Sequence, residues 1–227
     1  MSKNLFISLI LLFIISFFFS CGNDSETGRL EIHDDFKVEL SILGRISNVS
    51  MSHNFRASGP NISGSNDAEE FTKIIKNKLN NLAAGIYDVE NPVEEALITE
   101  IRHEIIISHQ LRYLTVVIET STIMTSGEEN KQIMATGFRT INGRYLQFNN
   151  AFSRNAIPSI ITELNNNLPE NSEGLIIDDK LFNEVIKDNS WYFTEEDLVV
   201  VFNSLANQPL ILSVPISFLR TNRLIRH

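Results

Sequence analysis

The stretch that decides the fold is residues 97–148, and its first strand-like run reads Ile101-Arg-His-Glu-Ile-Ile-Ile-Ser-His109. Isoleucine and histidine alternate there with charged and polar residues over about eight positions, which is the period of a half-buried strand. Residues 113–124 repeat the alternation and are crowded with β-branched side chains, which suit a pleated surface. These two runs predict neighbouring antiparallel strands.

A polar loop at 125–130 separates these runs from a third strand-like segment, 133–141. Asn142-Gly143 then leads into a fourth, 145–148. An Asn-Gly pair between two strand-like runs is typical of a type I′ hairpin, because both residues tolerate positive φ. The whole stretch therefore predicts an antiparallel meander with one face buried and the other available.

Helical and extended patterns flank the meander. Residues 36–43 alternate as a strand, and 47–56 is its candidate partner. Residues 67–84 carry a helical apolar stripe. Asn66 is the predicted N-cap of this helix, and Glu69, three residues later, completes a capping box. After the meander we expect helices at 156–168 and 179–186, and strands at 191–194, 198–202 and 210–214. The predicted fold is α+β, an antiparallel sheet meander covered by two main helices, 67–84 and 156–168.

Composition restricts the class of protein. The 227 residues are 43% hydrophobic and 21% charged, which is typical of a globular chain. The formal net charge of −9 argues against nucleic acid as a partner, since phosphates require a basic footprint. An acidic balance instead favours a basic partner through long-range attraction.

The N-terminus predicts a lipid anchor. Lys3 precedes an apolar run at 5–19, which has the length of a signal-peptide core. The run ends in Ser20-Cys21-Gly22, which resembles a bacterial lipobox, although Phe18 stands where an aliphatic residue is usual. Cys21 is the chain's single cysteine. We expect 1–20 to be a signal peptide, Cys21 to be lipidated, 21–35 to be a tether, and 36–227 to be one domain with parts 36–96 and 97–227.

Two other interpretations of the N-terminus remain: an uncleaved anchor, or secretion with an idle cysteine. A lipidated Cys21 places the protein in the bacterial cell envelope, with the membrane as a partner. Gly22 is not the aspartate that retains many lipoproteins at the inner membrane, so the outer membrane is favoured where the cell has one.

The second half resembles a known family through several short motifs. They are Phe138-Arg-Thr-Ile-Asn-Gly143, Trp191-Tyr-Phe-Thr-Glu-Glu-Asp-Leu-Val-Val-Val-Phe-Asn203 and Leu212-Ser-Val-Pro215, with Ile62-Ser-Gly64 before the first helix. Residues 45–220 thus resemble the extracellular domain of RsiV-type anti-sigma factors, which also accompanies PdaC-type peptidoglycan deacetylases. Some of these relatives bind lysozyme. Many carry a Gly-Gly-Ala-His loop where this chain has 125–130, and only Gly127 corresponds to it.

The residues indicate no catalytic or metal chemistry. His103 and His109 are six positions apart along a strand, roughly 20 Å, and Glu104 points to the opposite face. The sequence contains no phosphate-binding loop, dinucleotide glycine pattern or nucleophile elbow. We therefore expect no enzyme activity, no cofactor and no metal.

Two surface segments are candidates for partner contact. The loop Gly127-Glu128-Glu129 is the best candidate, with a solvated hairpin tip as the alternative. Arg220, Arg223 and Arg226 gather near the C-terminus, where we expect a frayed, solvated end, with contact to membrane phosphates as the alternative.

These observations predict a non-catalytic, lipid-anchored envelope protein that presents an RsiV-like domain for protein binding, with a basic partner such as lysozyme. One alternative is a glycan- or peptidoglycan-binding lipoprotein, which would need Tyr113, Tyr145 or Trp191 to be exposed and clustered. A second is a hydrolase, which would need a cleft with converging carboxylates or histidines.

Overall fold

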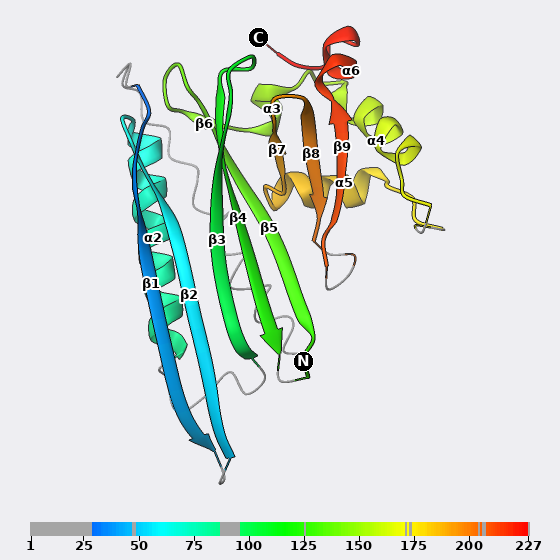
Figure 1. The fold of residues 1–227 in the computed structure, drawn as a ribbon. Coiled ribbons are helices and arrows are strands. Elements are labelled where there is room, and N and C mark those ends of the chain that lie inside the picture. The colour runs from blue at the N-terminus through cyan, green and yellow to red at the C-terminus, as the bar shows by residue number, and fades with distance from the viewer. Residues whose placement is uncertain are drawn as a thin grey trace.

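The computed structural model describes residues 29–46, 49–86, 96–124, 126–170, 172, 174–203, 205 and 208–226. Within them the chain forms a six-stranded sheet, a three-stranded sheet and five helices (Figure 1). The predicted signal peptide, Cys21 and the tether up to residue 28 lie outside the described residues.

The larger sheet combines antiparallel and parallel pairing. Its strands, in spatial order, are β1 (Glu31–Ile46), β2 (Val49–Ser63), β3 (Ala96–Ser108), β4 (Tyr113–Met124), β5 (Glu129–Arg139) and β6 (Tyr145–Leu146). The predicted meander is present from β3 to β6, but β2 and β3 pair in parallel. Parallel neighbours need a crossover, and the helix α2 (Asn66–Ile86) provides it by returning the chain to the end of the sheet where β2 began.

Helix α2 covers one face of the larger sheet. Its stripe of Phe71, Ile75, Leu79 and Ala83 packs on buried residues of β2 to β5, among them Phe55, Leu114, Val116 and Phe138. The helix is capped one residue earlier than predicted, because the Ser65 hydroxyl, not Asn66, accepts from the backbone N–H of Ala68 at 3.1 Å. The same hydroxyl donates to the Gly143 carbonyl at 2.9 Å, which ties the helix start to the β5–β6 loop.

The smaller sheet has its own helical cover. It contains β7 (Trp191–Phe193), β8 (Asp197–Phe202) and β9 (Leu210–Pro215), all antiparallel. One of its faces packs against helices α3 (Phe148–Ala151), α4 (Ala156–Asn166), α5 (Asp179–Lys187) and α6 (Ile216–Thr221). The prediction that the helix at 156–168 covers the meander is therefore wrong. Its apolar stripe is buried in the small-sheet core, where neighbouring rings of Phe148, Phe152, Trp191 and Phe193 lie 4.3 to 5.9 Å apart.

Three segments of the larger sheet also differ from the sequence prediction. Strand β1 begins at Glu31, inside the predicted tether, because that segment pairs with the end of β2. Gly143 has a positive φ of 63°, but Asn142 does not, so the β5–β6 connection is not the predicted type I′ turn. It is a wider loop, closed by a hydrogen bond from the Arg139 N–H to the Arg144 carbonyl. The extended segment after the loop stops at Leu146, and Phe148 starts α3.

The C-terminal segment is packed rather than frayed. Leu224 and Ile225 are buried, and Ile225 forms a β-bridge with Phe152. The backbone N–H of Arg226 donates to the Ala151 carbonyl at 2.8 Å. These contacts hold the final turn against the small-sheet core.

Candidate functional site

The small sheet is attached to the open edge of β5. The N–H of Ala135 donates to the carbonyl of Asn189 at 2.9 Å. Two positions along, the Asn203 side chain accepts from the Ile133 N–H at 2.9 Å and donates to the Ile133 carbonyl at 2.7 Å. The Asn203 amide thus takes the place of one residue of a neighbouring strand. This junction sets the outer faces of the two sheets next to each other.

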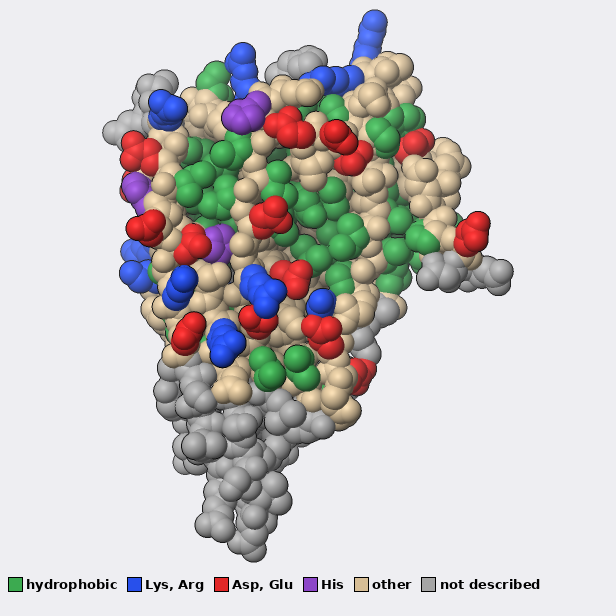
Figure 2. Space-filling model, viewed as in Figure 1, with side chains coloured by type: hydrophobic (Ala, Val, Ile, Leu, Met, Phe, Trp, Pro, Cys, Tyr) green, Lys and Arg blue, Asp and Glu red, His purple; other side chains and the backbone are tan. Residues whose placement is uncertain are grey.

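An apolar surface spans these two outer faces, and we name it the inter-sheet surface. Its residues are Ile106, Val117, Ile133, Ala135, Tyr192, Val199, Val201 and Ile211. Figure 2 shows hydrophobic side chains gathered over β4, β5 and the small sheet. Most of this surface is closely packed, but Ile106 and Tyr192 are half-buried and Ile211, the β9 partner of Val201, is 49% exposed.

Carboxylates border the inter-sheet surface. Glu104 lies opposite Val117 in the β3–β4 register, and Glu119 lies opposite Arg102. Burial raises the pKa of Tyr192, and the nearby negative charge of Glu104 raises it further, so Glu104 is close to this apolar surface. Arg102 is held by Glu100 at 2.7 Å, whereas Glu104 forms no ion pair with another described residue. The border is therefore suited to a cation on a partner.

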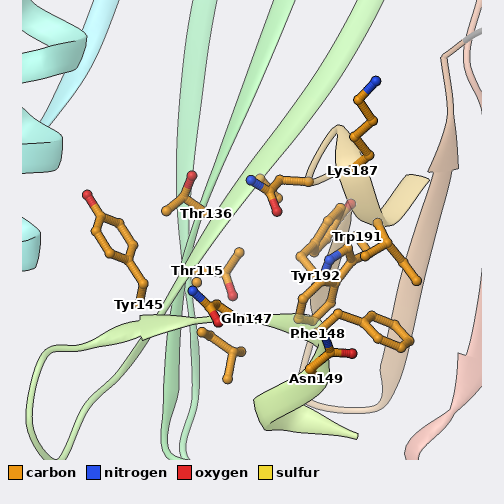
Figure 3. Close-up of a pocket in the computed structure, with 14 residues that line it drawn as sticks. Thr115, Thr136, Tyr145, Gln147, Phe148, Asn149, Lys187, Trp191 and Tyr192 are labelled. Atoms are coloured by element: carbon orange, nitrogen blue, oxygen red, sulfur yellow. The ribbon is translucent and has the colours of Figure 1, made fainter. Parts of the chain in front are cut away.

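A cleft of about 320 Å³ lies between the two sheets, a volume within the range of small-molecule sites. Its walls come from β4, β5, the β6–α3 segment, α5 and β7: Thr115, Ala135, Thr136, Gly137, Tyr145, Leu146, Gln147, Phe148, Asn149, Ile186, Lys187, Asn189, Trp191 and Tyr192. Figure 3 shows the two threonines across the cleft from the rings of Trp191 and Tyr192, and Lys187 extending away from these rings.

The cleft lining offers hydrogen bonds and aromatic contact. Within the described part of the chain, the side chains of Thr136, Gln147 and Asn149 form no hydrogen bond, so their hydroxyl and amide groups are free for a ligand. Lys187 is the cation among the lining residues, which include neither a carboxylate nor an imidazole. Such a set can bind a polar molecule through hydrogen bonds and contact with aromatic rings.

The predicted contact loop forms the tip of the β4–β5 hairpin. Gly127 has φ of 83°, and its N–H donates to the Met124 carbonyl at 2.9 Å. Glu128 is exposed at the tip. Glu129 is the first residue of β5, where its carboxylate accepts from the Ser121 hydroxyl at 2.7 Å, a bond that lowers the pKa of Glu129. The structure therefore leaves Glu128 at the surface and engages Glu129 within the sheet.

The aromatic residues named for glycan binding are not an exposed cluster. Tyr113 is 5% exposed and stacks on Phe193, and Trp191 is 6% exposed within the small-sheet core. Tyr145 is half-buried, and its pKa is raised by burial and by the charges of Asp67 and Glu70. Trp191 nevertheless lines the cleft.

His103 has a structural environment. Its ring nitrogens lie 3.1 Å from the Ser58 hydroxyl and 3.1 Å from a carboxylate oxygen of Asp35, which joins β3 to β2 and β1. Among the described residues, no three His, Cys, Asp or Glu side chains gather closely enough to hold a metal ion.

Comparisons with known proteins identify the fold. No protein-family model matches the sequence, and no curated protein matches it. Solved structures do match it. Among them are a DUF3298 family member from Bacteroides fragilis, with a TM-score of 0.54 and 11% identity, and a DUF3298 family protein from Pseudomonas aeruginosa, with a TM-score of 0.51 and 9% identity. The chain has the fold of DUF3298 proteins.

The DUF3298 likeness spans nearly the whole of each chain. It covers 89% of this chain and 96% of the Bacteroides protein, and 85% and 94% for the Pseudomonas protein. At this identity the likeness concerns the fold alone. Separately, no helix among the described residues is both long and apolar enough to cross a bilayer.

Proposed function

We propose that this chain is a non-catalytic, lipid-anchored protein of the bacterial cell envelope that presents its DUF3298 fold to a protein partner. The anchor is supported by the apolar leader that ends in Ser20-Cys21-Gly22 and by the single cysteine. The presentation role is supported by the motifs that resemble RsiV-type extracellular domains, and the fold of the solved neighbours agrees with a bacterial setting.

The observation that carries the binding proposal is the inter-sheet surface. Apolar side chains from both sheets meet there, Ile211 stands exposed, and Glu104 lies at the border without an ion pair among described residues. Interfaces combine an apolar centre with a polar rim. The chain's net charge of −9 and this border together favour a basic partner, and a lysozyme is the first such protein to test.

The anchor is tested by mass and partitioning. We expect the mature protein to begin at Cys21, to carry acyl chains and to enter the detergent phase. The Cys21→Ala variant should lose both the added mass and the detergent partitioning. Retention of either property by the variant would contradict lipidation at this residue.

The binding proposal is tested by titration calorimetry of the mature protein against a basic lysozyme at low and moderate salt. Ile211→Asp should weaken binding about tenfold or more, because it places a charge in the apolar centre. Ile176→Asp is the matched control, since Ile176 is 74% exposed on the α4–α5 connection, away from this surface. Equal affinities of the two variants, binding that vanishes at moderate salt, or no heat at either salt would refute the proposal.

The cleft favours a second function, glycan binding. Its free hydroxyl and amide groups beside Trp191 and Tyr192 are the groups that recognise sugars, although neither Trp191 nor Tyr113 forms an exposed platform. A soluble peptidoglycan fragment should shift NMR signals of cleft residues. Gln147→Ala should abolish that shift, and Gln110→Ala, an exposed position outside the cleft, should not. An unchanged spectrum with the fragment would remove the glycan function.

A further inference from the structure

We infer that one end of the molecule is a membrane-facing surface that binds anionic phospholipid headgroups. This arginine end consists of the exposed residues Arg29, Arg112, Arg144, Arg154, Arg220, Arg223 and Arg226, with Arg139 partly exposed. It includes eight of the chain's eleven arginines, in a protein of net charge −9. The inference rests on the proposed lipid anchor at Cys21 and adds a second, electrostatic contact with the same membrane.

Backbone and side-chain contacts bring these separate segments together. The β3–β4 turn meets the β5–β6 loop where the Thr140 N–H donates to the Arg112 carbonyl at 2.9 Å. The Arg139 guanidinium donates to the Asn150 carbonyl of α3 at 3.2 Å. The Arg220 guanidinium, on α6, donates to the Gln110 side chain at 3.1 Å. The arginines therefore share one end of the fold although they span almost two hundred positions of sequence.

The packed C-terminus fixes the last three of these arginines. Because Leu224 and Ile225 are buried and Arg226 is bonded to Ala151, this segment presents its guanidinium groups from a defined position. Guanidinium groups form paired hydrogen bonds to phosphate, which suits headgroup recognition.

The surface of this end also has the composition of a membrane contact. Figure 2 shows Lys and Arg side chains protruding at the upper end of the molecule, with the nearest acidic side chains lying below them. Glu195 is one nearby carboxylate, and it accepts from the His109 N–H at 3.0 Å; Glu196 follows it in the same turn. Ile141, in the β5–β6 loop, is 62% exposed, and so an apolar side chain is available to enter the headgroup layer.

The chain enters the fold at this same end. Arg29 precedes β1, and Leu30 lies against Gly143 of the β5–β6 loop. Cys21 is eight residues before Arg29, so even a fully extended chain places the lipid within about 29 Å of this end. A lipid on Cys21 therefore holds the arginine end, and not the β4–β5 tip, near the bilayer.

Electrostatic attraction then determines which way the domain stands. One arginine close to an anionic bilayer raises membrane affinity by roughly fivefold, so three together contribute on the order of a hundredfold. The twelve residues of β4 place the hairpin tip about 40 Å from the arginine end. Glu128, at the hairpin tip, would then be directed away from the lipid, toward the envelope space.

The test uses the acylated mature protein reconstituted in vesicles of phosphatidylcholine with or without phosphatidylglycerol. The lipid blocks the thiol of Cys21, so a single added cysteine can carry an environment-sensitive fluorophore. Ile141→Cys should show lipid contact in vesicles with phosphatidylglycerol, measured by quenching with nitroxide lipids. Ser126→Cys, at the β4–β5 tip, should remain in water in both vesicles.

Charge-reversal variants separate the arginines from charge in general. Arg220→Glu, Arg223→Glu and Arg226→Glu together should lower the equilibrium constant for lipid contact of the Ile141 probe by about a hundredfold or more, because each change removes a positive charge and adds a negative one. Lys73→Glu, Lys76→Glu and Lys180→Glu, three exposed cations on α2 and α5, should leave it unchanged.

Each outcome decides the inference. It is overturned if the Ile141 probe reports the same environment in both vesicles, if the Ser126 probe reports lipid contact, or if both triple variants behave alike. The mass of the purified protein reports acylation independently. An unacylated product would refute the proposed anchor, and co-sedimentation of that unlabelled protein with the two kinds of vesicle would then test the arginine end.

Discussion

The side chain of Asn203 provides the sharpest test of how the two sheets are joined. Its amide makes three hydrogen bonds, two to the backbone of Ile133 and one to the Ser190 hydroxyl at 3.1 Å. Ile133 is 8% exposed, so water does not readily replace the lost partner. A typical hydrogen bond contributes about 1 kcal/mol, and a buried group left unpaired costs about 1–3 kcal/mol. We expect Asn203→Ala to lower the free energy of unfolding by about 2–4 kcal/mol.

The assay is urea denaturation of the mature protein, with hydrogen exchange at the Ile133 amide as a local readout. Asn222→Ala is the control, because Asn222 makes one bond, to the Phe218 carbonyl, at an exposed helix end, and should cost less than about 1 kcal/mol. If Asn203→Ala costs no more than this control, or if exchange at Ile133 is unchanged, the amide does not join the sheets.

Asn203→Asp adds a dependence on pH. A carboxylate keeps the acceptor for the Ile133 N–H but faces the Ile133 carbonyl, which favours the protonated form and raises the carboxyl pKa in the folded state. The variant is then relatively most stable at acid pH, and it loses stability as pH rises through this raised pKa. A stability difference from the Ala variant that does not change with pH would contradict this geometry.

Three further predictions concern the rest of the fold. Phe152→Ala should lower the free energy of unfolding by about 3–5 kcal/mol in urea denaturation, because this ring is fully buried among others, and a loss below 1 kcal/mol would refute its place in the core. Burial lowers the pKa of Lys78 from 10.5 to about 8. Between pH 8 and 10.5 only the unfolded chain keeps this proton, so the free energy of unfolding should rise with pH in that window. Because Lys78 is partly solvated, we expect a rise of about 1–2 kcal/mol. Lys78→Met should remove this rise. Gly143→Ala should lower the free energy of unfolding by about 1–3 kcal/mol, measured by thermal denaturation, because φ is 63° and an added Cβ would meet the Ser65 side chain. Gly127→Ala should lower it by less, because Gly127 has φ of 83° but open space around it.

Local structure was largely predictable because each local pattern has one physical interpretation. Alternation over 101–109 and 113–124 matches β3 and β4, and the apolar stripe of 67–84 matches α2. Pairing was harder to predict. The alternation of β3 is satisfied by parallel or antiparallel neighbours, and only the crossover by α2 selects the parallel one. The stripe of α4 likewise showed that it covers a sheet without showing which sheet.

The candidate sites depended on contacts that no local pattern records. Asn203 follows a Val-rich strand, where an asparagine is typical of a turn, and its role appears only when β5 lies beside it. Ile211 was an ordinary strand residue until the two outer faces met. Arginines distributed from Arg29 to Arg226 become one surface only through the fold, and the sequence showed only their C-terminal group. The exposure of Glu128, by contrast, could be predicted from its polar loop alone.

The open edge of β5 explains why the two sheets form one structure. An exposed edge strand presents unpaired backbone groups to other chains and promotes aggregation. Here β6 pairs with β5 only at Gly137 and Phe138, and the edge beyond is occupied by Asn189, by the Asn203 amide and by the Gln208 side chain, which donates to the Glu129 carbonyl at 3.2 Å. Side-chain amides cover the edge without adding a strand, so the sheet ends here and Ile211 of the neighbouring sheet stays exposed. The same contacts that prevent edge pairing therefore also create the inter-sheet surface proposed for the partner.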